Sequence, residues 1–183
     1  MGFRDWLMGI FYRIAGRPYE VFHLASEHGI PADARIVRTT TRHAKAIHAL
    51  ERECFSDPWS IRSLKYEISH PHSVCLVAVN ENRMILGHIT MRQIFDEGHI
   101  YNVAVAENAR RQGIGRKLIE AVIYEAGILG ISSLTLEVRS KNHAAISLYE
   151  KLGFAACGHR KNYYRKPTDD ALVMMWKSDK EDL

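Results

Sequence analysis

The chain alternates between stretches with apolar residues at every third or fourth position and shorter stretches rich in β-branched residues. The first pattern is typical of amphipathic helices and the second of strands. Both recur closely from Ile36 onward, with Gly, Pro, Asn and Asp residues between them. They predict strands at 36–38, 74–79, 84–94, 100–106, 134–139, 155–162 and 172–176, and helices at about 41–54, 60–70, 113–129 and 142–152.

Strands that alternate with helices and also follow one another through short turns predict a mixed α/β sheet. Thr41 is placed to cap the first of the helices above. Residues 80–83 form a predicted hairpin turn, and Asp169-Asp170 a predicted turn before the last strand. The length of 183 residues, without internal repeats, fits one domain with a hydrophobic core.

The first 33 residues follow a different pattern. We expect an amphipathic helix and a connector at 1–33, a folded domain at 34–178 and a polar tail at 179–183. The helix either packs on protein or, as the less favoured alternative, lies on a membrane surface. Asp5 and Arg13 argue against a signal peptide, and no apolar run is long enough to cross a bilayer. The apolar positions of the expected N-terminal helix are Phe3, Leu7, Ile10, Phe11 and Ile14.

Composition narrows the function classes. Lys and Arg number 25 against 21 Asp and Glu, and the net charge of +4 is not gathered into the basic blocks typical of nucleic-acid binding. Three scattered cysteines indicate free thiols and a cytoplasmic protein rather than a disulfide framework. The ten histidines lack partners at metal-ligand spacing, so we interpret them as solvated or capping residues and expect no metal.

The segment 110–117 joins a β-branched strand to an amphipathic helix through two glycines, Gly113 and Gly115. Glycines let the backbone approach a ligand, and the free N–H groups of a helix start favour an anion. Leu118 stands where a dinucleotide fingerprint needs a third glycine, and the Walker pattern is absent. Four basic side chains favour a pyrophosphate ligand, although the glycines could also serve chain reversal alone. These are Arg110, Arg111, Arg116 and Lys117.

The run from Tyr101 to Phe154 resembles the Gcn5-related N-acetyltransferase (GNAT) superfamily, through the pattern Arg110-x-x-Gly113-x-Gly115. LEVR at 136–139, KNHAAISLYEKLGF at 141–154 and RKNYYRKPTDDALVM at 160–174 are similar to its ribosomal-protein-alanine N-acetyltransferase (RimI-like) group, as is FSDPWS at 55–60. The resemblance covers residues 36–176. It implies a mostly antiparallel GNAT sheet flanked by helices, with acetyl-CoA as co-substrate.

The resemblance also implies two catalytic residues. Glu137 shares one strand face with Thr135 and Arg139 and would be the proton acceptor, while the structural alternative is an ion pair with Arg139 or another surface ion pair. Tyr149 would be the general acid, and the alternative is an aromatic residue that packs its helix onto the sheet.

Further residues are implied to bind the two substrates. Asn142 would contact acetyl-CoA and is also a plausible helix N-cap. Trp59, Tyr163 and Tyr164 would contact the acceptor, although Trp59 could equally be core and the tyrosine pair could be one buried and one exposed residue. The implied acetyl-CoA positions on the strand and at the glycine turn are Val103, Ala104, Val105, Arg110, Arg111, Gln112, Gly113, Ile114, Gly115 and Arg116.

The resulting hypothesis is direct attack of an amine on acetyl-CoA in a ternary complex, because no Cys–His arrangement supports a covalent enzyme intermediate. The resemblance implies a protein N-terminal α-amine as acceptor, with a small-subunit ribosomal protein as the expected partner. A broad-specificity N-terminal acetyltransferase and a small-amine acetyltransferase are the enzymatic alternatives. A CoA-binding scaffold module without activity is the non-enzymatic one.

Overall fold

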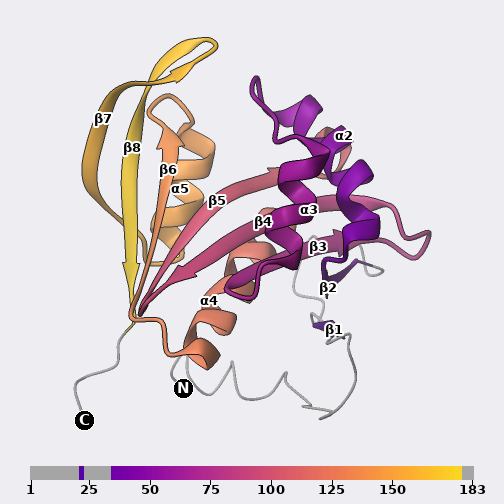
Figure 1. The fold of residues 1–183 in the computed structure, drawn as a ribbon. Coiled ribbons are helices and arrows are strands. Elements are labelled where there is room, and N and C mark those ends of the chain that lie inside the picture. Colours follow the sequence, from indigo (N-terminus) through magenta and orange to yellow (C-terminus); the bar gives the residue numbers. More distant parts are fainter. Residues whose placement is uncertain (1–20, 23–33, 179–183) are drawn as a thin grey trace.

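The computed structural model describes residues 21–22 and 34–178. In this part of the chain, one eight-stranded sheet has the order β1-β2-β3-β4-β5-β6-β8-β7 (Figure 1). Its strands are β1 (Val21–Phe22), β2 (Arg35–Arg38), β3 (Ser73–Val79), β4 (Ile85–Ile94), β5 (Glu97–Val105), β6 (Ser133–Arg139), β7 (Ala155–Arg165) and β8 (Thr168–Lys177). The helices are α2 (Ala44–Cys54), α3 (Ile61–Ser69), α4 (Ile114–Leu129) and α5 (His143–Lys151), with 3₁₀ turns at Thr41–His43 and Glu107–Ala109.

Different helices cover the two faces of the sheet (Figure 1). On β3, Val77 and Val79 pack with the apolar sides of α2 and α3, whereas Leu76 and Ala78 join the larger core that includes α4. A strand buried on both faces carries an uninterrupted apolar run, which explains the sequence of β3. The predicted mixed, mostly antiparallel sheet flanked by helices is therefore confirmed.

Two local predictions are wrong. Thr41 does not cap α2, because it begins a 3₁₀ turn and the α-helix starts at Ala44. Asp169 and Asp170 lie inside β8 rather than in a turn. Their carboxylates serve neighbouring segments: Asp169 Oδ1 accepts from Ser140 Oγ at 3.0 Å, and Asp170 Oδ1 accepts from the Asn162 N–H at 2.8 Å.

The sheet splits between β5 and β6. These strands pair in parallel only over Glu97–Ile100 and Ser133–Leu136, and beyond that point they diverge (Figure 1). Beyond Ile100, β5 pairs only with β4, and beyond Leu136, β6 pairs only with β8. Among the described residues, no strand therefore pairs with the edge of β5 at 101–105 on the side toward β6.

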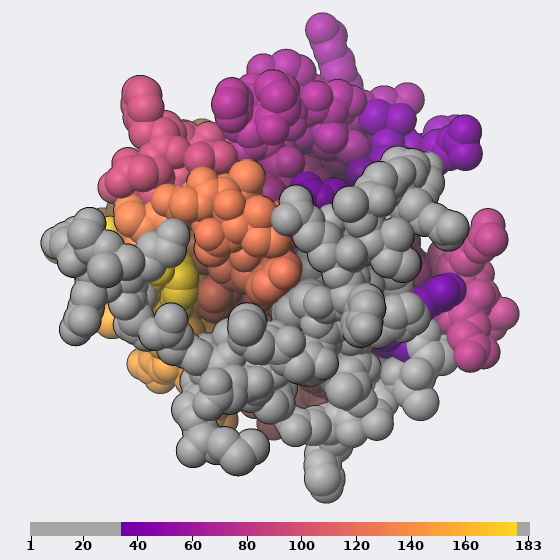
Figure 2. Space-filling model, turned by 90° about the horizontal axis from the view of Figure 1, so that it is seen from below, coloured from indigo at the N-terminus to yellow at the C-terminus, as the bar shows by residue number. Residues whose placement is uncertain are grey.

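The opposite end of these strands is closed. The Ser132 N–H donates to the Asp96 carbonyl at 2.7 Å, which holds the α4–β6 turn against the β4–β5 turn. In the view from this end, the orange surface of α4 and the residues after it adjoins the pink surface around the β4–β5 turn (Figure 2). A sheet that is joined at one end and split at the other presents its backbone and side chains in the split.

The expected N-terminal helix and the polar tail lie outside the described residues. The domain boundaries stay a prediction. No helix in the described part of the chain is both long and apolar enough to cross a membrane.

Candidate active site

Glu137 lies at the point where the sheet splits. Leu136 is the last β6 residue paired with β5, so Glu137 is the first residue beyond the pairing. Its side chain is 8% exposed, and each carboxylate oxygen has a cationic or polar partner. His99 Nε2 lies 3.0 Å from Oε2, and Arg160 Nη2 lies 3.1 Å from Oε1. The predicted strand face is confirmed, and the partners of Glu137 are His99 and Arg160 instead of Arg139.

His99 is a site residue that sequence reasoning missed. The parallel register of β5 and β6 places His99 opposite Thr135, and its Nδ1 lies 3.0 Å from Thr135 Oγ1. The interpretation of the histidines as solvated or capping residues is wrong here and at His88, which is 1% exposed on β4. The signal was the pair of polar positions on adjacent strands, and only the pairing register reveals it. Within residues 34–178, no group of three or more His, Cys, Asp or Glu side chains is placed to hold a metal ion.

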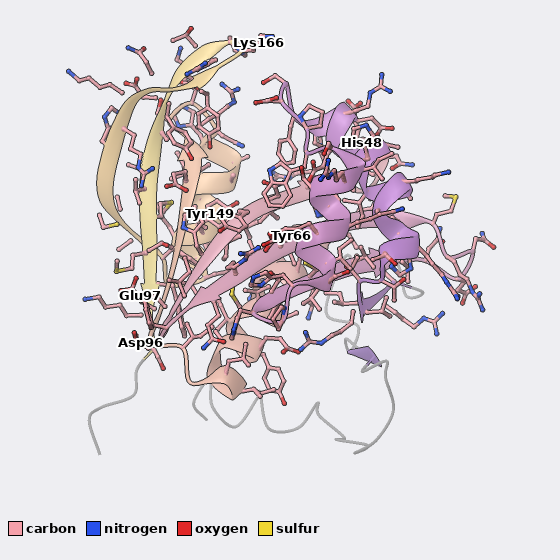
Figure 3. The ribbon with its side chains drawn as sticks, in the orientation of Figure 1. His48, Tyr66, Asp96, Glu97, Tyr149 and Lys166 are labelled. Atoms are coloured by element: carbon pink, nitrogen blue, oxygen red, sulfur yellow. The ribbon has the colours of Figure 1, made fainter. Side chains whose placement is uncertain are left out.

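Tyr149 lies on α5, beside β6 and near the point of divergence (Figure 3). Its ring packs against Phe154 with centroids 5.8 Å apart, and the residue is 8% exposed. Burial raises the pKa of Tyr149, and Tyr164 raises it further. The phenol is therefore protonated at neutral pH, as a proton donor must be, so packing and an acid role are compatible.

Asn142 caps α5, since its Oδ1 accepts from the Ala145 N–H at 3.2 Å. The N-cap interpretation is thus confirmed. The amide NH₂ group of Asn142 has no protein partner among the described residues, so it can still donate to a ligand while the cap persists.

The residues that the resemblance implies would contact the acceptor lie on two sides of Glu137. On one side, Tyr164 Oη donates to the Glu137 carbonyl at 3.2 Å, and Tyr163 stands edge-on to Tyr164 and is 46% exposed. Burial raises the pKa of Tyr164 to about 12. On the other side, a row of rings runs from Trp59 through Tyr101 to His99, with centroid separations of 5.5 and 5.0 Å.

Trp59 also lines an open hollow of about 450 Å³ on α3, together with Arg62, Ser63, Tyr66 and Glu67. Trp59 is half-buried in this position, so one side of it packs in the protein while the other borders the hollow. The core alternative is thus partly met, while the role of Trp59 in acceptor binding stays a prediction.

The glycine turn offers unpaired backbone donors. Gly113 has φ 77° and Arg111 φ 62°, both left-handed, and α4 begins after Gly113 with no side-chain cap. The N–H groups of the first helical turn, residues 114–116, therefore have no acceptor within the helix. A Cβ added to Gly115 would sit 3.6 Å from both Leu148 and Val105, an ordinary contact distance. Protein packing does not require glycine at 115, so the bare backbone there fits close approach by a ligand.

Three side chains of this turn have contacts within the protein. Arg110 donates from Nε to the Val105 carbonyl at 3.2 Å, and its Nη2 lies 3.8 Å from Cys54 Sγ. Gln112 donates to the Asn108 carbonyl at 2.8 Å, and Arg116 pairs with Glu120 at 2.8 Å. Arg110 and Gln112 thus hold the loop, whereas the pair of Arg116 and Glu120 lies within α4. The backbone N–H groups of residues 114–116 remain as donors for an anion.

Glu51 is a second residue that sequence reasoning missed. This fully buried carboxylate on α2 accepts from the Trp59 N–H at 2.7 Å and from Asn102 Nδ2 at 2.6 Å. His88 Nε2 lies 3.2 Å from it, outside good hydrogen-bond geometry. Glu51 thereby ties α2 to the loop that carries Trp59 and to the β5 edge at the split. Its place in a helical repeat gave no signal, because a buried Glu and an exposed Glu look alike in sequence.

Comparison with known proteins agrees with this geometry. Residues 44–154 match the acetyltransferase (GNAT) family. The chain belongs to this family. As such it is an N-acetyltransferase that uses acetyl-CoA, and the split sheet with its glycine turn has the donors that a pyrophosphate requires.

The curated relatives are specific in name. The chain is 33% identical over 138 residues to ribosomal protein bS18-alanine N-acetyltransferase of Escherichia coli K12, covering 73% of this chain and 90% of that one. It is 35% identical over 139 residues to the protein of the same name from Salmonella typhimurium, covering 74% and 91%. The crystal structure of the ribosomal-protein-S18-alanine N-acetyltransferase from Escherichia coli aligns with a TM-score of 0.73 at 28% identity, over 82% of this chain and 99% of that one.

Proposed function

We propose that this acetyltransferase acetylates the N-terminal α-amine of a protein, and that its acceptor is the alanine terminus of ribosomal protein S18. The identity to enzymes of that name, over nine tenths of their length, supports the choice of acceptor. The single observation that carries the activity is the buried Glu137 carboxylate at the β5–β6 split, held between His99 and Arg160.

Glu137 would accept the proton of the attacking amine, directly or through one water. Two neighbours occupy one position on each oxygen, yet a carboxylate has about four acceptor positions. The remaining positions can bind an ammonium group or a water. His99 would orient the carboxylate: with Nε2–H donating to Glu137, its Nδ1 accepts from Thr135 Oγ1. Because both ring nitrogens are engaged, His99 is a supporting residue rather than the first base.

Tyr149 would donate a proton on the thiolate side of the reaction. A phenol kept neutral by burial can protonate a thiolate of ordinary pKa about 8.5. Acetyl-CoA supplies the thioester that the amine attacks. The open β5 edge at 103–105 would align its pantetheine arm by strand-like hydrogen bonds, and the free amides of residues 114–116 would hold its pyrophosphate.

The chemistry of the acceptor suits this site. A protein α-amine has an ordinary pKa of about 7.7–8.0, against about 10.4 for a lysine side chain. Deprotonation near neutral pH therefore costs about 3 kcal/mol less for the α-amine. A carboxylate base without strong activation is sufficient for the first and poorly suited to the second.

A peptide panel tests the proposal. The purified full chain receives acetyl-CoA and peptides of the S18 N-terminal sequence that begin with Ala, Ser, Met or Gly, together with an α-blocked peptide that contains lysine. Free CoA and the acetylated position are measured by thiol assay and mass spectrometry. We expect the Ala peptide to have the highest kcat/KM and the α-blocked peptide to remain unmodified.

The other outcomes discriminate among the alternatives. Equal turnover of Met and Ser peptides would replace the S18 assignment by a broad N-terminal acetyltransferase. Turnover of small amines alone would remove the protein acceptor. CoA binding without turnover of any amine would leave the scaffold alternative.

A further inference from the structure

One side chain joins the two segments that carry the implied acceptor residues. Arg139 is the last residue of β6, two positions after Glu137 and on the same strand face. Its Nη1 donates to the Pro167 carbonyl at 2.9 Å, and its Nη2 donates to the Lys166 carbonyl at 2.9 Å. The same Nη2 also donates to Ser56 Oγ at 3.3 Å. The guanidinium thus binds the β7–β8 turn and the α2–α3 loop at once.

Arg139 also contacts an implied acceptor residue directly. Its guanidinium carbon lies 4.3 Å from the centre of the Tyr164 ring, a cation–π arrangement. Tyr164 in turn donates to the Glu137 carbonyl. A displacement of Arg139 would therefore remove contacts from the β7–β8 turn, from the Tyr164 ring and from the α2–α3 loop that carries Trp59.

An ordinary surface ion pair does not account for these contacts. The carboxylate nearest to Arg139 is Asp169, at 4.0 Å, which is the limit of an ion pair and worth little at a partly exposed site. The three shorter contacts go to uncharged oxygens of two separate segments. Only a planar guanidinium with several fixed donors can meet two carbonyls and a hydroxyl together.

We propose that Arg139 is a positioning residue for the acceptor: it holds the β7–β8 turn and the α2–α3 loop at a fixed separation, so that aromatic side chains on both sides meet the incoming protein terminus. This proposal rests on the proposed function for the identity of the acceptor. We expect Arg139 to act on acceptor binding and not on acetyl-CoA, because its side-chain hydrogen bonds go to the β7–β8 turn and to Ser56 and none goes to a residue of the glycine turn.

The test compares Arg139→Met, Arg139→Lys and Ser56→Ala with the wild-type chain. For R139M we expect the KM of the best peptide in the panel to rise about tenfold or more, as expected for the loss of one charge-assisted hydrogen bond. We expect kcat and the Kd of acetyl-CoA, measured by calorimetry, to change less than about twofold. R139K, which keeps the charge without the fork, should be intermediate.

Ser56→Ala removes only the link between the two segments. We expect a smaller rise in acceptor KM, and no further rise when S56A is added to R139M. The matched control is Arg165→Met, which removes one positive charge at the end of β7, beside the β7–β8 turn, from an exposed residue with no side-chain contact among the described residues. R165M should leave KM and kcat at wild-type values.

A readout independent of turnover separates this proposal from the proposed function. Amide hydrogen exchange at residues 55–60 should quicken in R139M and S56A and remain unchanged in R165M. If the wild-type chain acetylates no peptide while this exchange pattern holds, the proposed function fails and the link between the segments stands. Unchanged exchange at 55–60 in R139M, additive effects of S56A and R139M on KM, or parallel losses of acceptor and acetyl-CoA affinity would each overturn the proposal.

Discussion

At the scale of single residues, the site depends on where one carboxylate is placed along a strand. The Glu137 side chain is buried, but His99 and Arg160 lie against its two carboxylate oxygens, so its negative charge has partners. The residue after the last β5–β6 pair is the first whose side chain can face the split from β6. A shift of one residue in register would turn Glu137 to the other face of the sheet.

Replacing Glu137 by Gln should separate chemistry from binding. The amide keeps the shape and one acceptor but cannot take a proton, so we expect kcat to fall about 10²–10⁴-fold, the usual contribution of a general base. Acetyl-CoA affinity should stay within about twofold. Steady-state kinetics and calorimetry check both, and unchanged turnover in E137Q would remove Glu137 from the role of base.

At the scale of elements, the start of α4 gains its binding capacity from backbone geometry. The left-handed residues 111 and 113 turn the chain so that the first N–H groups of α4 have no acceptor within the helix. Basic residues around the turn add long-range attraction for an anion, although Arg110 and Arg116 are bound to protein groups. The groups that would donate directly to the pyrophosphate are backbone amides, which do not depend on the side chain. Close approach of the pyrophosphate to this backbone, however, requires a residue without a Cβ.

Gly115→Ala gives a sharp test of that statement. The added Cβ meets protein atoms only at 3.6 Å, and alanine is the better helix former, so thermal stability should be unchanged or slightly higher. Acetyl-CoA affinity should fall at least tenfold if the backbone at 115 touches the pyrophosphate. Differential scanning calorimetry and titration calorimetry measure the two effects. Full affinity in G115A would contradict the assignment of the loop.

Glu51 links three elements, and its loss should be visible in stability. In Glu51→Gln the amide offers one acceptor where Trp59 N–H and Asn102 Nδ2 both donate, so one buried donor loses its partner. We expect a loss of about 1–3 kcal/mol in the free energy of unfolding. The double variant E51Q/N102D restores donor–acceptor matching, and urea unfolding should show partial recovery. A double variant less stable than E51Q would argue against this pairing.

At the scale of the whole molecule, the fold keeps one end of the sheet joined and the other split, and it buries weakly acidic side chains on several strands. Burial raises the pKa of Cys75 from 9.0 to about 12 and that of Tyr164 from 10.0 to about 12. Each group is neutral in the folded state at pH values where the unfolded chain would already release the proton. Their contribution to stability is therefore complete below the unfolded pKa and is lost as pH rises toward the folded one.

The free energy of unfolding should accordingly decline between about pH 9 and 12, and the raised pKa of Tyr149 should add to this decline above pH 10. Cys75→Ala removes the thiol and should reduce the slope from pH 9 upward, while Tyr164→Phe should reduce it only above pH 10. Urea unfolding at a series of pH values measures this. A slope that neither substitution changes would show that other groups govern alkaline unfolding.

Much of the fold followed from local pattern. Apolar periodicity located the helices and most strands, because burial of one face is imposed residue by residue. It misplaced the β7–β8 turn, since Asp169 and Asp170 look like turn residues but act as acceptors for Ser140 and Asn162 across the sheet. Such a role depends on the partner strand and has no local signature.

The sequence by itself determined the order of elements, the glycine turn and the family, since spacing and residue type suffice for these. The tertiary structure alone decided which side chains meet: His99 and Arg160 at Glu137, Glu51 beneath Trp59, and Arg139 between two loops. The physical reason is that these contacts join residues from strands and loops distant in the chain. Pairing register and helix packing bring them within hydrogen-bond distance, and neither is a property of any one segment.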